Sequence, residues 1–178
     1  MDESESQTAQ LDAIARLDRL FGRNGMEYWL FGGWAVDFHI GAVTRHHADI
    51  DVAVVAGDAA RITALLESDG WTHRRELDGD GYSSYEASGT RLEVALLARD
   101  EHGRFYTPLT GGRAEWPVGA FGADVATLRG VRARVISRQA VIAEKSGLHD
   151  DPAIAAKDRA DLARLMDCGT ASPLRSAD

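Results

Sequence analysis

Three acidic residues interrupt apolar segments of the chain in a pattern that favours metal-assisted chemistry. Asp49 and Asp51 lie at positions i and i+2 of the run ADIDVAV, and Glu93 lies in the apolar run LEVALL. Side chains alternate along a strand, so the two aspartates project from one face. A third carboxylate on a neighbouring strand would complete an oxygen-rich pocket of the kind in which Mg²⁺ is shared with substrate phosphates. The pattern predicts a metal-binding and catalytic site, and its alternative is a solvated edge strand.

A glycine pair upstream supplies the second half of this chemistry. Gly32 and Gly33 open the run GGWAVD, which leads from an apolar segment into a helical one. Free N–H groups at the start of a helix bind phosphate, and glycine lets the phosphate approach the backbone. We therefore expect Gly32 and Gly33 to bind the triphosphate of a nucleotide, although a plain strand-to-helix turn is the alternative. A phosphate cradle beside a Mg²⁺ site is typical of phosphoryl and nucleotidyl transfer.

The segment TRHH before the aspartates adds basic residues. The guanidinium of Arg45 suits phosphate oxygens, and His47 shares the strand parity of the two aspartates, so both are predicted nucleotide ligands. Adjacent histidines on a strand point apart, which disfavours a zinc site made by His46 and His47. The alternative for Arg45 is a loop arginine paired with Asp37, which we expect to be a supporting or capping residue.

Taken together, GGWAVD, TRHHADIDVAV and LEVALL resemble the nucleotidyltransferase superfamily that includes DNA polymerase β. Within it, the chain is similar to the aminoglycoside 2''-nucleotidyltransferases and lincosamide nucleotidyltransferases, from about Tyr28 to Met166. The resemblance implies an α+β fold: a small mixed β-sheet with flanking helices and a helical C-terminal end. It also implies that Glu93 is the third metal ligand, the general base on the acceptor hydroxyl, or both. By the same resemblance Lys145 reaches the triphosphate. The alternatives are a solvent-facing Glu93 and an exposed Lys145.

The implied activity is Mg²⁺-dependent transfer of a nucleoside monophosphate, AMP from ATP, to a hydroxyl of a small antibiotic. Two Mg²⁺ ions are expected with the bound nucleotide. A net charge of −8 attracts cationic molecules, which favours an aminoglycoside over a lincosamide. A nucleotidyltransferase acting on tRNA or protein, as toxin or regulator, and a non-catalytic nucleotide-binding module are the alternatives.

Aromatic and acidic residues suit a polycationic sugar, although core packing explains them nearly as well. On this basis the predicted substrate contacts are Tyr82, Tyr85, Glu86 and Trp116.

Composition bounds the other partners. The 178 residues suit a single domain over 1–178, with 44% apolar and 27% charged residues. No apolar run approaches the roughly 20 residues of a membrane span, and the acidic N-terminus lacks the features of a secretory signal. The single cysteine, Cys168, excludes an intramolecular disulfide. We expect a cytoplasmic protein with no membrane partner. The net negative charge disfavours nucleic acid as a partner. A homodimer is compatible with the sequence.

Periodicity and turn residues predict the elements that position these residues. Residues 1–8 are expected to be disordered, residues 100–122 to form an irregular loop near the substrate, and residues 137–168 to form the helical C-terminal part. The sheet is expected to carry its helices mainly on one side. The expected helices are 8–23, 34–40, 57–68, 137–147 and 152–168, and the expected strands are 28–31, 49–55, 71–76, 82–87, 90–98 and 131–136.

Overall fold

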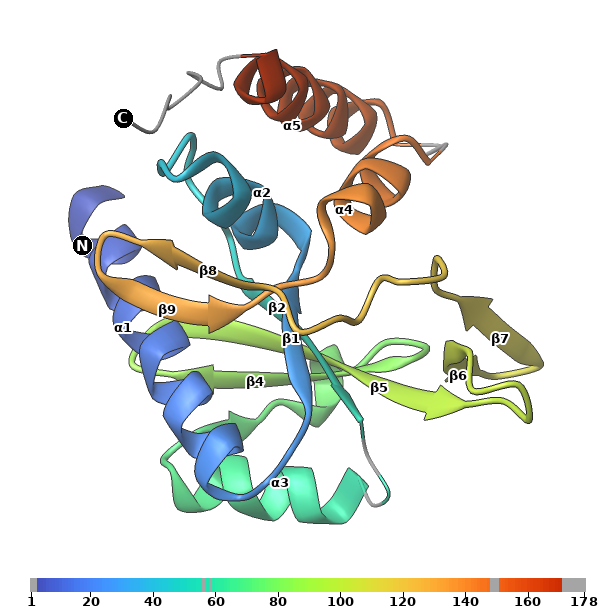
Figure 1. Cartoon of the computed structure of the whole chain (residues 1–178). Helices are drawn as coiled ribbons and strands as arrows, with labels where there is room; N and C mark the ends of the chain where they lie inside the picture. Colours follow the sequence, from blue (N-terminus) through green and yellow to red (C-terminus); the bar gives the residue numbers. More distant parts are fainter. Residues whose placement is uncertain (1–2, 56, 58, 148–150, 171–178) are drawn as a thin grey trace, which may run out of the picture.

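The structure, a computed structural model, describes residues 3–55, 57, 59–147 and 151–170. A mixed β-sheet runs through its centre (Figure 1). Its strands are β1 (Tyr28–Phe31), β2 (Ile50–Val55), β3 (Thr72–His73), β4 (Tyr82–Ala87), β5 (Thr90–Arg99), β6 (Phe105–Leu109) and β7 (Gly112–Glu115). The helices are α1 (Glu3–Arg23), α2 (Gly32–Ile40), α3 (Ala59–Ser68), α4 (Arg138–Lys145) and α5 (Pro152–Thr170), with a 3-10 turn at Arg75–Leu77. The predicted α+β class, with a mixed sheet and a helical C-terminal end, is confirmed.

The strand order β1-β2-β5-β4-β3 places the two acid-bearing segments side by side. Strands β2 and β5 are parallel, and their register sets Asp51 directly beside Glu93. The other pairings within this sheet are antiparallel, and β6 and β7 extend it from the far end of β5. The short ribbon of β8 (Val125–Leu128) and β9 (Val131–Arg134) lies against β1 through the bridge from Leu30 to Val135.

Helices cover both faces of the sheet, so the expectation of helices mainly on one side is wrong. In Figure 1, α1 and α3 lie beneath the sheet, and α2, α4 and α5 lie above it. Alternation along the strands explains the two layers. Ile50, Val52 and Val54 of β2 are buried in one core with residues of α1 and α3, whereas Ala53 belongs to a second core with residues of α4 and α5. The apolar face opposite Asp49 and Asp51 is therefore confirmed.

Several predicted boundaries need correction. Helix α1 begins at Glu3, so residues 3–8 are helical rather than disordered, and residues 1–2 lie outside the described residues. Residues 100–122 contain the β6–β7 hairpin, which turns at Gly111 with φ of 107°. Every residue of β7 is exposed, which removes the apolar alternation by which strands are recognised. The strand expected over 71–76 is reduced to β3 and the 3-10 turn.

Other boundaries agree closely with the sequence pattern. Helix α2 ends at Gly41 with φ of 81°, a left-handed C-cap that favours glycine. Ser137 caps α4 by accepting a hydrogen bond from the Ala140 amide, and Pro152 is the first residue of α5. Helix α3 begins at Ala59, and Asp58, where its start was predicted, lies outside the described residues. Among the described helices, none has the length and apolarity that a lipid bilayer would require of a crossing segment.

Candidate active site

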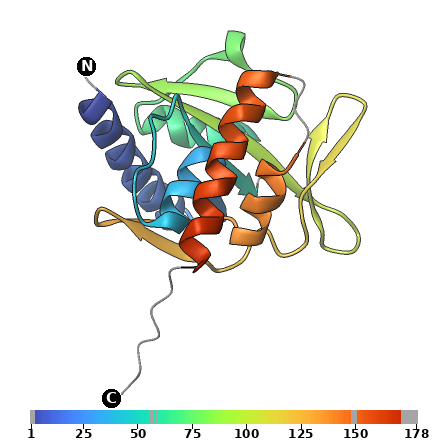
Figure 2. The same ribbon diagram turned by 90° about the horizontal axis from the view of Figure 1, so that it is seen from above.

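A pocket of about 410 Å³ opens where β1 ends and α2 begins, beneath α5. Figure 2 shows α5 crossing above α2 and running beside α4. The pocket lining combines residues from five separate parts of the sequence, which the fold brings together. They are Phe31, Gly32, Gly33, Arg45, His46, His47, Ala48, Asp49, Asp51, Glu93, Glu144, Lys145, Ile154, Lys157 and Asp158.

All three predicted acids face this pocket. Asp49 lies just before β2, Asp51 is the second residue of β2, and Glu93 lies opposite Asp51 on β5. The parity of the strand sets the first two on one face, and the parallel register brings the third to them. The solvent-facing alternative for Glu93 is therefore not what the fold shows, although the side chain retains 26% exposure. We refer to Asp49, Asp51 and Glu93 as the acid cluster.

Burial and like charge raise the proton affinity of this cluster. The pKa of Asp51 is raised well above its ordinary value, first by burial and then by the negative charges of Asp49, Glu144 and Glu93. Burial, followed by the charge of Asp49, also raises the pKa of Glu93, and Arg91 acts in the opposite direction. Crowded carboxylates of this kind favour a cation that neutralises them. The donor set, carboxylate oxygen throughout, is the one that Mg²⁺ prefers.

The cluster is not closed around a metal position in this structure. Across the residues that the structure describes, no three His, Cys, Asp or Glu side chains form a group that could hold a metal ion. Instead the Arg91 Nη2 atom donates to Asp49 Oδ2 at 2.7 Å, and Arg91 Nε lies 3.9 Å from Glu93 Oε1. The acids share one pocket, and their role as metal ligands stays a prediction.

Both glycines are required by close side-chain contacts. A Cβ atom on Gly32 would overlap the carboxylate of Asp51, and Gly32 adopts a left-handed φ of 64°. A Cβ atom on Gly33 would overlap the guanidinium of Arg45 and lie 2.6 Å from His47 Nδ1. The pair therefore does more than turn the chain, because it lets acid and base side chains pack against the start of α2. Phosphate binding by Gly32 and Gly33 stays a prediction.

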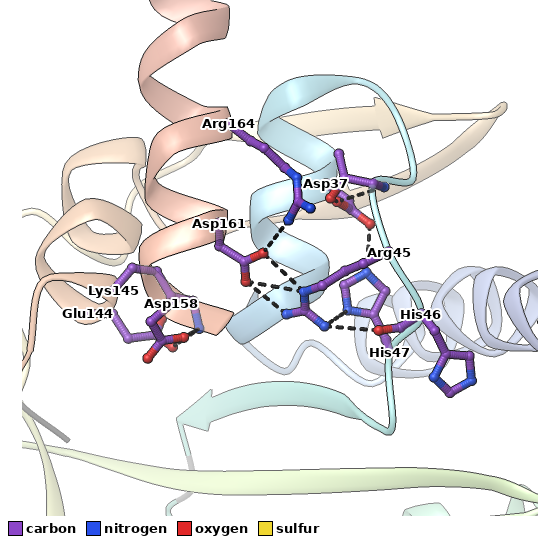
Figure 3. Close-up of polar contacts among 10 residues, drawn as sticks. Asp37, Arg45, His46, His47, Glu144, Lys145, Asp158, Asp161 and Arg164 are labelled. Atoms are coloured by element: carbon purple, nitrogen blue, oxygen red, sulfur yellow. Dashed lines mark hydrogen bonds and ion pairs between the residues drawn. The ribbon is translucent and has the colours of Figure 1, made fainter. Parts of the chain in front are cut away.

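Arg45 and His47 belong to a hydrogen-bonded chain that joins α2, the loop after it, and α5 (Figure 3). Arg45 donates from Nε and Nη2 to the carboxylate of Asp161, with the Nη2 distance at 2.8 Å, and Nη1 lies 3.0 Å from His47 Nδ1. His47 Nε2 lies 2.6 Å from Asp37 Oδ2, and Asp37 Oδ1 accepts from the hydroxyl and amide of Thr44. We call Asp37, Arg45, His47 and Asp161 the clamp.

The clamp changes the interpretation of its members. Arg45 is paired with Asp161 rather than with Asp37, so the predicted alternative for this arginine named the wrong partner. Arginine can only donate, so His47 accepts at Nδ1 and donates from Nε2 to Asp37. Most of the polar atoms of Arg45 and both ring nitrogens of His47 are thus engaged within the protein. Asp37 is a buried supporting residue, as expected.

Lys145 lies inside the pocket wall rather than in solvent. Its side chain is 7% exposed, and Nζ lies 3.1 Å from Asp158 and 3.3 Å from Glu144. Burial favours the neutral amine, but the carboxylates of Glu144 and Asp158 outweigh it and raise the pKa of Lys145. The exposed alternative is wrong, and a charged lysine faces the space in which the triphosphate was predicted.

The predicted substrate contacts do not gather at this pocket. Tyr85 is a core residue, 2% exposed, with its hydroxyl 2.9 Å from Thr63 Oγ1, so its prediction as a substrate contact is wrong. Tyr82 lines a different hollow, and Glu86 pairs with Arg74. Trp116 packs edge-on against Phe31, which lines the pocket, and its Nε1 donates to Thr107. Only Trp116 therefore adjoins the site.

Sequence reasoning missed functional neighbours that reach the site from distant elements. Arg91 lies two residues before Glu93 on β5, and this shared strand parity is the sequence signal that identifies it. Asp158 and Asp161 lie one turn apart on α5, and each binds a cation of the pocket, Lys145 and Arg45 respectively. Asp161 also lies 3.3 Å from Arg164 Nη1, so its carboxylate binds two arginine side chains.

Comparison with known proteins gives this geometry a context. The model of the aminoglycoside-2''-adenylyltransferase family matches residues 13–165. A 2''-aminoglycoside nucleotidyltransferase from Escherichia coli is 32% identical over 71 residues, which cover 40% of this chain and 40% of that protein. A protein of the same name from Klebsiella pneumoniae gives the same identity and coverage. The aligned segment thus spans less than half the length of these curated relatives.

Solved structures share the fold. A crystal structure of ANT(2'')-Ia in complex with adenylyl-2''-tobramycin matches with a TM-score of 0.70 at 22% identity, covering 92% of this chain and 90% of that one. A lincomycin-bound lincosamide antibiotic adenylyltransferase matches with a TM-score of 0.66, also at 22% identity, over 84% of this chain and 92% of that one. The fold of this chain is therefore a known architecture.

Proposed function

The chain belongs to the aminoglycoside-2''-adenylyltransferase family, and we propose that it is a Mg²⁺-dependent enzyme that transfers AMP from ATP to a hydroxyl of an antibiotic. The resemblance predicted from the sequence motifs is thereby confirmed at the level of the family. The observation that carries the proposed chemistry is the acid cluster: Asp49, Asp51 and Glu93 share one pocket, and burial and like charge raise the pKa of Asp51 and Glu93.

The reaction assigns a different role to each part of the cluster. The acceptor hydroxyl oxygen forms a bond to the α-phosphorus as the bond from that phosphorus to the bridging oxygen breaks, and pyrophosphate leaves. Glu93 takes the proton of the attacking hydroxyl. A raised pKa suits this role, because a base closer to neutrality accepts a proton more effectively. The Glu93 side chain is partly buried but lines the pocket, so it is accessible to an acceptor there.

Asp49 and Asp51 are the proposed Mg²⁺ ligands, with Glu93 beside them. When bound, Mg²⁺ neutralises phosphate charge and polarises the phosphoryl oxygen. The fit rests on the chemistry of the site: the carboxylates carry oxygen donors, and their mutual repulsion is relieved by a cation. We retain two ions with bound nucleotide as part of the proposal.

For the nucleotide, the proposed contacts are the backbone at Gly32 and Gly33 and the ammonium of Lys145. Lys145 faces the pocket and stays charged, since the pKa of its amine is raised. Arg45 and His47 are assigned chiefly to positioning, because the clamp already engages them. They form the pocket wall on which the triphosphate would lie.

An aminoglycoside is the favoured acceptor, ahead of a lincosamide. Carboxylates outnumber lysine and arginine side chains in the pocket lining, which favours a cationic acceptor. The curated relatives are named for 2''-aminoglycoside transfer, whereas a structural neighbour binds lincomycin. Transfer to tRNA or protein is the second candidate, and the net charge of −8 argues against a polyanionic acceptor.

A screen of aminoglycosides and lincosamides with ATP and Mg²⁺, read as pyrophosphate release, tests the proposal. We expect turnover with at least one aminoglycoside, and mass spectrometry should show an AMP adduct on the drug. Asp49→Ala should abolish turnover, whereas Glu115→Gln, a change in an exposed ion pair of β7, should leave it unchanged. Turnover that persists in Asp49→Ala, or that fails for every antibiotic, would overturn the proposal.

A further inference from the structure

Arg91 is placed among the acids of the pocket by the alternation of β5. It lies two residues before Glu93, so both side chains project from the same face of the sheet. Its Nη2 atom donates to Asp49 Oδ2 at 2.7 Å, and its Nε atom lies 3.9 Å from Glu93 Oε1. One guanidinium therefore stands between two members of the acid cluster.

The fold itself makes little use of this ion pair. The Arg91 side chain is 43% exposed, and its partner Asp49 is 25% exposed. A pair as exposed as this contributes little to the stability of a protein. In the described part of the chain, Arg91 Nε is buried without a hydrogen-bond partner, so the guanidinium is not fully accommodated where it lies. The contact between Arg91 and Asp49 is thus better explained by a role in the pocket than by a role in stabilising the fold.

We infer that Arg91 is a tethered cation that competes with the divalent metal ion for Asp49. The inference rests on the metal site of the proposed function. A carboxylate that pairs with a guanidinium has less negative charge to offer a metal ion, and two cations beside one carboxylate repel each other. Metal binding at Asp49 must therefore displace Arg91, and the two events are linked with equal and opposite effect.

The displaced guanidinium has a second acidic neighbour. Register places Glu86 of β4 directly opposite Arg91, and cross-strand neighbours of this kind lie within reach of long side chains. The Glu86 side chain is 43% exposed and already pairs with Arg74 at the sheet edge. Arg91 can move from Asp49 toward Glu86 by rotating its own side chain, with no change in the backbone.

An opposite role for Arg91 makes the inference testable. Carboxylates that bind metals are often held in place by an outer hydrogen-bond donor, and removal of such a donor weakens metal binding. Competition predicts the reverse, because removing the competitor strengthens metal binding. The sign of the change therefore separates the two roles.

The experiment measures Mn²⁺ binding to the full chain without nucleotide, from the electron paramagnetic resonance signal of the free ion. Arg91→Gln should bind Mn²⁺ about tenfold more tightly than the wild type, and Arg91→Lys, which keeps the charge, should show a smaller gain. Arg99→Gln is the matched control. It lies on the same strand, removes the same charge from a 47% exposed ion pair, and should leave the affinity unchanged.

The outcomes distinguish this inference from the proposed function. Competition is overturned if the wild type binds Mn²⁺ through Asp49, as shown by loss in Asp49→Ala, while Arg91→Gln binds no more tightly. An equal gain in Arg99→Gln also overturns it, because the effect would then be one of net charge. If neither the wild type nor Arg91→Gln binds Mn²⁺, there is no metal ion at Asp49 for Arg91 to compete with and the inference is overturned, whereas the proposed function is decided by the turnover screen with ATP and Mg²⁺.

Discussion

The acid cluster and the clamp lie in the same pocket wall, yet their charges are balanced in different ways. In the clamp, Asp161 is matched by Arg45, and Asp37 accepts hydrogen bonds from Thr44 and His47. In the acid cluster, burial and the like charges of Asp49, Glu144 and Glu93 raise the pKa of the Asp51 carboxyl, and the charge of Lys145 opposes them only in part. A buried charge with an opposite partner is compensated within the protein, whereas a buried carboxylate among like charges is compensated only when a cationic ligand binds. The same substitution of aspartate by asparagine should therefore have opposite effects on stability in the two groups.

Asp51→Asn gives the largest expected effect on activity. It removes a proposed metal ligand, and we expect antibiotic adenylylation to fall by about 10³-fold or more, since metal stabilisation of the transition state amounts to several kcal/mol. The same variant should unfold at a higher temperature without metal, because a crowded carboxylate is lost. Steady-state turnover and thermal denaturation check both parts, and a variant that is active or less stable would contradict the comparison.

Glu93→Gln should separate binding from chemistry. A glutamine cannot accept the proton, and loss of general-base help typically costs about 10²- to 10⁴-fold in rate. ATP binding, measured by calorimetry with Mg²⁺, should be largely preserved, because the base acts only on the acceptor hydroxyl. If ATP binding is lost while turnover per bound ATP remains, Glu93 is a ligand and not the base.

Asp161→Asn tests the contribution of the clamp to the free energy of unfolding of the protein. Breaking a buried ion pair by removing one partner costs about 3–5 kcal/mol, and the 20% exposure of Arg45 places the expected loss at the lower end, about 3 kcal/mol. Urea denaturation measures it. Glu115→Gln on β7 is the control, because its pair with Arg113 is equally short but exposed, and it should cost less than about 1 kcal/mol. Equal losses would remove the distinction between the two regions.

The sequence predicted those parts of the site that depend on strand parity. Alternation around Asp49, Asp51 and Glu93 correctly set the acids on one face, and the parallel register of β2 and β5 completed the cluster. The same rule places Tyr85 of β4 on the opposite face from Tyr82 and Glu86, because residues an odd number of positions apart on a strand face opposite sides.

Other features could not be read from local sequence. Lys145 on α4 pairs with Asp158 of α5, and Arg45 pairs with Asp161 of α5; the second contact joins residues 116 positions apart in the chain. Strand β7 lacks apolar alternation because all its residues are exposed, and it is defined by pairing with β6 alone. Local patterns identify elements and faces, whereas such long-range pairs depend on how the elements pack.

The pH dependence of stability should also distinguish the two regions. The folded pKa values of Asp51 and Glu93 are raised above their unfolded values, so the folded protein binds more protons than the unfolded chain in that range. The contribution of these two groups to stability is then fully present below the ordinary carboxyl pKa of about 4 and is lost as the pH rises through the raised values. Chemical denaturation from pH 4 upward, without metal, should show this fall, and Asp51→Asn should flatten it. A slope that Asp51→Asn leaves unchanged would assign the effect to other groups.

The smallest expected effect concerns long-range attraction of the acceptor. The pocket lining carries more carboxylates than lysine and arginine side chains, and the net charge of the chain is −8, so a polycationic aminoglycoside should be attracted by a Coulomb term that salt screens. We expect its Michaelis constant to rise a few-fold between low and physiological ionic strength at fixed Mg²⁺ and ATP. A lincosamide carries at most one amine charge and should show little dependence, which makes it the control.

The acid cluster contributes to the electrostatic field at the pocket, so Glu93→Gln should reduce the salt dependence of aminoglycoside binding, measured by calorimetry. The charges of the clamp are paired and contribute little to this field, so a substitution in the clamp should not reduce the salt dependence. Michaelis constants that are insensitive to salt for every drug would remove the electrostatic argument for an aminoglycoside and place the lincosamide first.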